Sequence, residues 1–372
     1  PLARQGGGGG WAPDGPQTFV ERLALSPPAP SSSGGPGAPA DRTLVAGGAG
    51  LFLAPVTGAG PGRAGHLHWT RVGPFDDHNL VLGMDLPRRG PVAAWVGTVN
   101  GLWLAARLGG PYRRVASFPS RTVHAIAVGP TDPAVVWASS AAGFLRSTDG
   151  GRHWRAENAG VASPATAWAL AFLDGRLYGS AGNAVYRWSG SGWAPTSPQY
   201  GVVMLDPTPG GRLFASSMGD GIRMLAGGRW QPADGGLLVH DQGAINGIHV
   251  VSVTARPGQP AYAGTMADGV AVSLDGGRSW SRTWSGLAGR GVVWRVVPVG
   301  RTLVAATDSG VLAYTLPARP APSALWWLAV AGSALLAAGT AALVLTGSTR
   351  PAGPSPSPGG RAGPGADSTA GA

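Results

Sequence analysis

The hydrophobic positions of this chain fall in many short runs of valine, leucine, alanine and tryptophan, separated by turns rich in glycine and proline. Short apolar runs bounded by turn residues are typical of β-strands. The stretch 324–346 is an exception, because it is uncharged and much longer than a strand. The pattern therefore predicts an all-β domain followed by one apolar segment of a different kind.

One short phrase recurs seven times: an aliphatic pair, small residues, a turn, a glycine and then an aliphatic or aromatic residue. The position that marks the end of each turn is occupied, in order, by Gly50, Gly101, Gly143, Ala184, Gly221, Gly269 and Gly310. These markers lie 37 to 51 residues apart. A period of forty-odd residues made only of strands is typical of a propeller blade. We therefore predict a seven-bladed β-propeller over residues 11–316.

Each phrase supplies the second and third strands of a blade, and an apolar strand precedes it. A large aromatic residue marks the fourth strand in six blades: Trp69, Tyr112, Trp154, Trp193, Trp230 and Trp280. We expect these rings to fill the wedge between neighbouring blades. The seventh blade lacks its own fourth strand, but the segment around Trp11 resembles the fourth strands at Trp193 and Trp230. The N-terminal strand is therefore expected to complete the seventh blade and close the ring.

The flanking regions have other compositions. Residues 1–10 are glycine-rich and expected to be flexible, and 317–323 form a short proline-rich linker. The 23 residues 324–346 carry no charge, lie between Arg319 and Arg350, and begin near the pair Trp326 and Trp327. This pattern predicts one transmembrane helix with interfacial tryptophans. Residues 347–372 consist mostly of Gly, Pro, Ser and Ala and are expected to be disordered.

The sequence specifies less sharply on which side of the membrane the propeller lies. Arg301 and Arg319 before the apolar stretch balance Arg350 and Arg361 after it, so charge bias does not select an orientation. A C-terminal anchor commonly follows a secreted domain, and a signal peptide would precede Pro1. We therefore favour a single-pass protein with an extracytoplasmic propeller. The alternative is a tail-anchored protein whose propeller is cytoplasmic.

The composition narrows the chemistry. All 28 basic residues are arginine and the net charge is +10, but the arginines are scattered along the sequence. The only adjacent pairs are Arg88 with Arg89 and Arg113 with Arg114, so nucleic-acid binding is not predicted. The absence of cysteine excludes disulfides, thiolate metal sites and cysteine nucleophiles.

Two turns carry a sharper motif, STDGGRHW and SLDGGRSW. They match Ser-x-Asp-x-Gly-x-x-Trp at Ser147, Asp149, Gly151 and Trp154, and at Ser273, Asp275, Gly277 and Trp280. The sequence thereby resembles the BNR or Asp-box repeat superfamily, which includes sialidases, sortilin-type receptors and propellers that help to assemble photosystem II. Serine and aspartate can accept hydrogen bonds from the NH groups of their own turn. We expect these motifs to fix hairpins rather than to bind a ligand.

Similarity to sialidases would imply an arginine cluster, a Tyr/Glu nucleophile pair and an acidic proton donor. The early Arg-Ile-Pro motif of that family is not present, and only Glu21 and Glu157 are glutamates, neither at a position expected to face the channel mouth. No pair of carboxylates suited to glycoside hydrolysis can be assigned. The histidines show no metal-ligand spacing. We therefore predict no catalytic residue, metal or cofactor, and keep an exo-sialidase-like hydrolase as the alternative.

In a propeller the first strand of each blade lines the central channel, and the connections that enter it share one face with the turns between second and third strands. The polar residues expected to ring this channel mouth are Asp77, His78, Arg121, His124, Tyr200, His240, Asp241, His249 and Arg290. The linker leaves from the opposite face, so this mouth should point away from the membrane. Such a ring can bind an anion, a glycan or a peptide, although it is also what an ordinary solvated rim looks like. The sequence thus favours a non-enzymatic binding or assembly module with a protein or glycan partner.

Overall fold

A computed structural model describes residues 10–28, 42–56, 66–162, 166–196, 201–217, 221–237, 250–266, 268–284, 287 and 291–316. The predicted linker 317–323, transmembrane helix 324–346 and disordered tail 347–372 lie outside these residues, as does nearly all of the segment 1–10. None of the described residues forms a helix long and apolar enough to cross a membrane.

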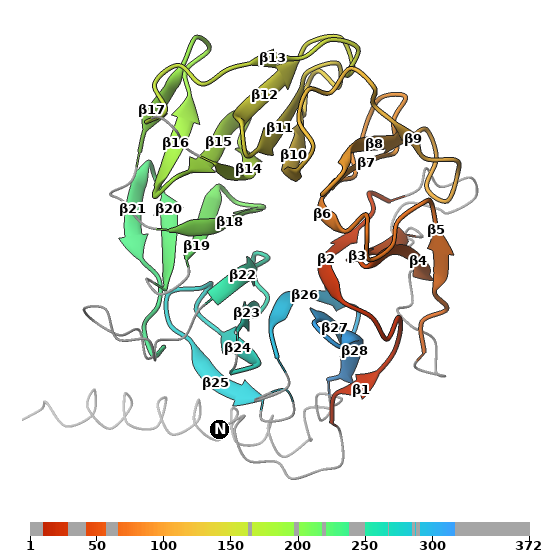
Figure 1. Cartoon of the computed structure of the whole chain (residues 1–372). Helices are drawn as coiled ribbons and strands as arrows, with labels where there is room; N and C mark the ends of the chain where they lie inside the picture. The colour runs from red at the N-terminus through yellow and green to blue at the C-terminus, as the bar shows by residue number, and fades with distance from the viewer. Residues whose placement is uncertain are drawn as a thin grey trace, which may run out of the picture. The chain divides into compact units, whose positions relative to one another are not determined.

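The described chain forms seven four-stranded antiparallel sheets arranged as a ring of blades (Figure 1). The first four blades contain β2 (Val20–Leu25), β3 (Arg42–Gly48), β4 (Gly50–Val56) and β5 (Thr70–Val72); β6 (Val81–Asp85), β7 (Ala94–Thr98), β8 (Gly101–Ala105) and β9 (Arg113–Arg114); β10 (Val123–Val128), β11 (Val136–Ser140), β12 (Gly143–Ser147) and β13 (Arg155–Ala156); and β14 (Ala167–Leu173), β15 (Arg176–Ala181), β16 (Ala184–Trp188) and β17 (Trp193–Pro195). The last three contain β18 (Val202–Thr208), β19 (Arg212–Ser217), β20 (Ile222–Ala226) and β21 (Arg229–Pro232); β22 (Val250–Thr254), β23 (Ala261–Thr265), β24 (Val270–Ser273) and β25 (Ser281–Trp284); and β26 (Val293–Val299), β27 (Thr302–Thr307), β28 (Gly310–Thr315) and β1 (Ala12–Pro13). This arrangement confirms the predicted seven-bladed β-propeller.

The hydrophobic core lies between neighbouring blades, because each sheet presents one apolar face to the blade on either side. Between the third and fourth blades, Phe144 of β12 stacks on Trp193 of β17 with ring centroids 4.1 Å apart, and Trp137 meets the same indole edge-on at 5.5 Å. All three side chains are buried. Burying large aromatic side chains is among the strongest contributions to a core. The fourth-strand aromatics at Trp193, Tyr112 and Trp280 therefore fill the inter-blade wedges as predicted.

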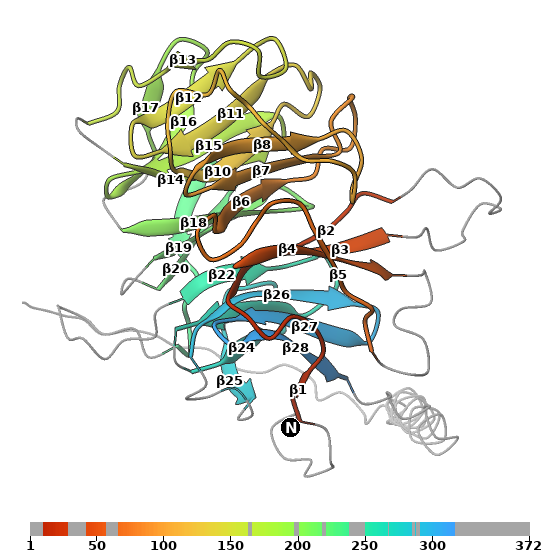
Figure 2. The ribbon, with the colours of Figure 1, turned by 45° about the vertical axis from the view of Figure 1, so that its right-hand side comes forward.

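The two ends of the described chain meet in the seventh blade (Figure 2), where β1 pairs with β28 in the register Ala12 to Ala313 and Pro13 to Leu312. Trp11 is 8% exposed and lies against Tyr314, with ring centroids 5.6 Å apart. Gly310 opens β28 at φ 118°, and a Cβ atom there would lie 2.0 Å from the carbonyl oxygen of Pro16. The N-terminal segment thus passes so close to β28 that only glycine fits.

Replacing Trp11 by alanine tests how much this pairing stabilises the ring. Removing a buried tryptophan costs both its transfer free energy and a cavity, so Trp11→Ala should lower the free energy of unfolding by about 3–5 kcal/mol. Trp168→Ala is the matched control, because Trp168 is 43% exposed and its loss should cost about 1 kcal/mol or less. Chemical denaturation measures both. Equal effects of the two substitutions would contradict a stabilising role for the N-terminal strand.

Candidate functional site at the channel mouth

The innermost strand of every blade shifts register at its second residue. The shifts lie between Val20 and Arg22 in the first blade and at the equivalent place in the other six. The residues that fall out of register are Glu21, Leu82, His124, Trp168, Val203, Val251 and Trp294. A β-bulge of this kind bends the strand and re-aims a side chain. The fold thus repeats one local distortion seven times around the entrance of the channel.

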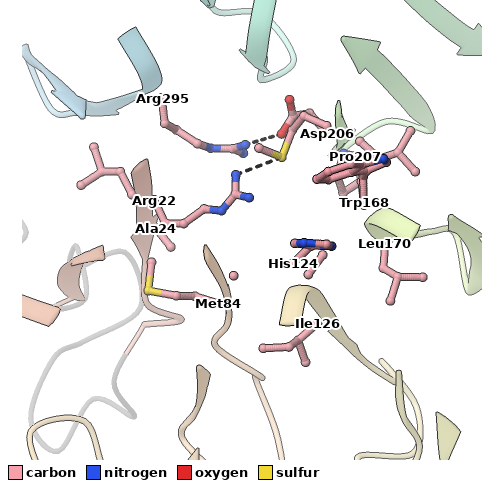
Figure 3. A pocket seen from close by; sticks show the side chains of 16 residues that line it. Arg22, Ala24, Met84, His124, Ile126, Trp168, Leu170, Asp206, Pro207 and Arg295 are labelled. Carbon is pink, nitrogen blue, oxygen red and sulfur yellow. Dashed lines mark hydrogen bonds and ion pairs between the residues drawn. The ribbon is translucent and has the colours of Figure 1, made fainter. Parts of the chain in front are cut away.

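The channel holds a pocket of about 180 Å³ that is lined by residues of six innermost strands, β2, β6, β10, β14, β18 and β26. Side chains of Arg22, His124, Trp168, Asp206 and Arg295 surround this space (Figure 3). Apolar side chains such as Met84 and Ile126 line the remainder (Figure 3). The result is a narrow pocket that combines two guanidinium groups, one imidazole and one indole with apolar walls.

His124 and Trp168 form the aromatic side of this pocket. Their rings are stacked, with centroids 4.6 Å apart and planes inclined by 23°. The imidazole Nδ1 donates a hydrogen bond to the carbonyl oxygen of Ala167 at 2.8 Å. Desolvation lowers the pKa of His124, and the nearby Arg22 guanidinium lowers this pKa further. The ring is therefore neutral at pH 7, with the lone pair on Nε2, and it supports an indole that is 43% exposed.

Arg22 is fixed on the opposite side of the pocket. Its Nη2 lies 3.0 Å from the Glu21 carboxylate, its Nε donates to the carbonyl oxygen of Leu82, and its Nη1 lies 3.6 Å from the sulfur of Met204. Glu21 occupies the out-of-register position of β2, and its charge influences the pKa of His124. This glutamate therefore lies near the mouth, where the sequence did not place it.

Two carboxylates, Asp206 and Asp85, tie the innermost strands of neighbouring blades together. Asp206 is 2% exposed, accepts a hydrogen bond from the backbone NH of Val253 at 2.7 Å and forms an ion pair with Arg295. In the same way, Asp85 accepts a hydrogen bond from the NH of Val128 at 2.6 Å. Desolvation raises the pKa of Asp85 to about 6. These two contacts hold strands of adjacent blades at a fixed distance around the channel.

The predicted mouth residues separate into three groups. His124 lines the channel pocket. His78 and Arg121 lie in a second, more open groove of about 460 Å³ beside Trp103 and Asn100, and Asp77 is exposed in the adjoining connection. Tyr200, His240, Asp241, His249 and Arg290 lie outside the described residues.

The sequence prediction missed Arg22, Trp168, Asp206 and Arg295. Trp168 and Arg295 stand at the out-of-register position or directly after it. The available signal was a bulky residue one or two places into the first strand of a blade. It was overlooked because strict alternation assigns such residues to the faces between blades.

The two Ser-x-Asp-x-Gly-x-x-Trp turns use their polar groups internally. In the first, Asp149 Oδ1 accepts hydrogen bonds from the Ser147 hydroxyl at 2.8 Å and from the NH groups of Arg152 and His153 at 3.0 Å. Ser147 Oγ in turn accepts the NH of Gly151 at 2.8 Å. A Cβ atom on Gly151 would lie 2.6 Å from the Trp95 ring, which explains the glycine.

The second turn repeats the arrangement. Asp275 Oδ1 accepts hydrogen bonds from the Ser273 hydroxyl at 2.7 Å and from the NH groups of Arg278 and Ser279 at 2.9 Å. Trp280 Nε1 donates to the carbonyl oxygen of Ala233 at 2.7 Å, which attaches the hairpin to the preceding blade. Across the described residues, no group of three or more histidines, aspartates or glutamates could hold a metal ion.

The hydrogen bonds to Asp149 and Asp275 hold the pKa of each carboxyl well below its usual value. An unfolded aspartate titrates near about 3.9. The lowered folded-state pKa values therefore stabilise the fold above this pH, and this stabilisation is lost as the pH falls through the folded-state values. The double variant Asp149→Asn, Asp275→Asn should be less stable than the wild type at pH 7, and the difference should shrink below pH 4 in denaturation measurements.

The control is Asp77→Asn, because the exposed Asp77 carboxylate accepts no hydrogen bond from any residue that the structure describes. It should change neither the stability nor its pH dependence. A constant difference between the double variant and the wild type from pH 7 to pH 2 would contradict the role of the ionised carboxylates.

The ion pair between Asp206 and Arg295 leads to another prediction about the free energy of unfolding. Arg295→Met leaves a carboxylate with 3% side-chain exposure without its cation, which should cost about 3 kcal/mol. Adding Asp206→Asn removes the unpaired charge but keeps an oxygen for the NH of Val253, so the double variant should recover more than half of the loss. Thermal or chemical unfolding tests this, and simple additivity of the two losses would contradict the pairing.

No protein-family model matches the sequence, and no curated protein matches it. Solved structures with the same architecture include YCF48 bound to D1 peptide, with 14% identity and a TM-score of 0.58 over 86% of this chain and 98% of that chain. They also include the extracellular domain of BT4673 from B. thetaiotaomicron, with 11% identity and a TM-score of 0.58 over 84% of this chain and 40% of that one. The WD40 propeller domain of Doa1 has 10% identity and a TM-score of 0.57 over 84% and 98% of the two chains. At these identities the likeness establishes the fold, and the chain is a seven-bladed β-propeller similar to proteins of different functions.

Proposed function

We propose that the chain is a binding or assembly module that holds an extended segment of a partner protein at the channel mouth formed by Arg22, His124 and Trp168. The observation that carries this proposal is the stacked pair His124 and Trp168, because it places an exposed indole at the entrance of a polar pocket. Exposed aromatic and arginine side chains at the centre of a surface are the residues that most often dominate protein recognition.

The mouth offers complementary groups to a peptide. Trp168 provides an apolar surface for a side chain, and the neutral imidazole of His124 offers Nε2 as an acceptor for a backbone NH. The Arg22 guanidinium, held in place by Glu21 and Leu82, provides positive charge for a carbonyl or carboxylate. Because these side chains are already ordered by contacts within the protein, binding does not have to order them again. Among the similar structures, YCF48 was solved with a bound peptide, which supports the same class of partner here.

The proposal includes an extracytoplasmic, membrane-anchored chain. The support is the uncharged stretch 324–346 in the sequence, together with the likeness to propellers that are extracellular domains. We also propose that the two Ser-x-Asp-x-Gly-x-x-Trp turns make the protein a member of the Asp-box superfamily, and that the pairing of β1 with β28 closes the ring.

We further propose that the propeller is not an enzyme. Among the residues that the structure describes, the carboxylate that lines the channel pocket is Asp206, which is paired with Arg295, and Glu21 near the mouth is paired with Arg22. Most glycosidases act with a pair of carboxylates that are free to reach the substrate, and neither of these carboxylates is free. Incubation of the purified full chain with a fluorogenic sialoside tests this directly, and turnover that is abolished by Asp206→Asn would establish the hydrolase instead.

The binding proposal is tested with the full chain carrying a photo-crosslinking amino acid at Val203, the out-of-register position of the neighbouring blade. Irradiation of membranes should give one predominant adduct to a protein. The double variant Trp168→Ala, His124→Ala should reduce this adduct at least tenfold, whereas Arg187→Ala, which removes an exposed side chain of β16 in the same blade as Trp168, should not. An unchanged adduct in the double variant would contradict the site, and loss of the adduct after deglycosylation would identify a glycan as the ligand.

A further inference from the structure

The fold gathers arginines that the sequence spaces widely. The connections between first and second strands, and between third and fourth strands, emerge on the face opposite the channel mouth described above. Exposed arginines in or directly beside these connections are Arg88, Arg89, Arg107, Arg113, Arg152, Arg155, Arg176, Arg229, Arg278 and Arg301. We call this surface the basic face. The described acidic residues in the same connections are Asp132, Asp149, Asp174 and Asp275.

The four acids of the basic face are outnumbered by its exposed arginines. Asp132 accepts a hydrogen bond from the NH of Ala134 at 2.9 Å, and the two turn aspartates accept hydrogen bonds from their own hairpins, so these three carboxylates are held by backbone groups. By contrast, the guanidinium groups of Arg88, Arg89 and Arg152 make no ion pair or hydrogen bond with any residue in the described ranges. Their charge is therefore available to an external anion.

The connections of the channel-mouth face are mainly acidic. The described ones contain Asp14, Asp76, Asp77, Glu157, Asp234, Asp268 and Asp308, against Arg121 within them and the exposed Arg114 directly beside them. The charge is thus separated along the axis of the ring. A field of this kind orients the molecule toward an anionic surface.

The basic face also exposes apolar surface. Leu274, at the tip of the second Ser-x-Asp-x-Gly-x-x-Trp turn, is 70% exposed. A groove of about 660 Å³ lies between the second and third blades, and its lining includes Arg89 and Arg152 together with Asp132 and Asp149 over the buried side chains of Trp95 and Leu104. Arginines around exposed apolar groups are typical of surfaces that lie at a membrane interface.

The last described residues of the chain lie on the basic face. Leu316 follows β28, and its carbonyl oxygen accepts a hydrogen bond from Arg301 at 2.6 Å. In the sequence, only seven residues separate Leu316 from the start of the uncharged stretch at Ala324. If that stretch is the anchor, as proposed above, the face that lies nearest to the attachment point is the basic one.

We propose that the basic face docks on anionic lipid headgroups through Arg88, Arg89 and Arg152, with Leu274 entering the interfacial layer. This inference rests on the proposed membrane anchor. Headgroup phosphates supply the anionic partners that these guanidinium groups do not have among the described residues. The attraction between them is strong only within about 10 Å at ordinary salt. Docking would hold the channel mouth away from the bilayer, facing a partner.

The absence of cysteine makes the orientation directly measurable. A fluorophore is attached to Leu274→Cys, or to Asp77→Cys as the control on the opposite face, in the full chain. Each protein is reconstituted in phosphatidylcholine vesicles with or without about 30% phosphatidylglycerol, all containing a headgroup-quencher lipid. Quenching at position 274 should be at least twofold greater in the anionic vesicles and should be lost in 0.5 M salt, while position 77 should remain unquenched.

The triple variant Arg88→Ser, Arg89→Ser, Arg152→Ser should reduce quenching at position 274 to the value in neutral vesicles, while its unfolding transition stays unchanged. Equal quenching at 274 with and without phosphatidylglycerol, or equal quenching at 274 and 77, would overturn the proposal. A fluorescence response at position 274 to RNA but not to anionic vesicles would overturn it in favour of a nucleic acid. Flotation with neutral vesicles tests the anchor separately, because its failure leaves the lipid-dependent quenching measurable.

Discussion

Packing between neighbouring blades is the interaction on which the rest of the structure depends. Each blade of this fold has two apolar faces, and each face is buried against the neighbouring blade, so a blade depends on its neighbours for its core. The stacked pair Phe144 and Trp193 shows how one such interface is filled. The same requirement applies to both neighbours of every blade. We propose that the pairing of β1 with β28 meets it in the seventh blade by closing the ring.

The ring geometry then determines where chemistry can occur. Seven innermost strands converge on one axis, and the register shift near the start of each strand changes the side chains presented at the mouth. The shifts in the third and fourth blades place His124 and Trp168 side by side at the mouth, and those in the seventh and first blades place Trp294 and Glu21 there. The connections at the two ends of the strands form separate faces, one with exposed arginines and the other with aspartates. A propeller can in this way bind different surfaces at its two faces without any change of fold.

The sequence predicted the fold well because the repeat can be read directly from the order of residues along the chain. Glycine at the turns and aromatic residues in the fourth strands are required by local geometry and by the inter-blade wedge, so both remain visible in the sequence. The site was predicted only in part. His124 was found because it begins an innermost strand, but Trp168, Arg22 and Arg295 depend on a register shift that the alternation of residues does not reveal. The basic face was missed for a related reason, because arginines far apart in the sequence become neighbours only when the blades are placed around the ring. Five of the predicted mouth residues, from Tyr200 to Arg290, lie outside the described residues and stay predictions.

The central claim is that the channel mouth recognises a partner protein. It is tested most directly by determining the structure of the full chain in complex with the protein captured from its own membranes. The account predicts density for an extended peptide segment over the Trp168 indole, with a group of the partner within hydrogen-bond distance of His124 Nε2 or the Arg22 guanidinium. A partner bound to the outer strands, with the channel mouth open to solvent, would contradict it.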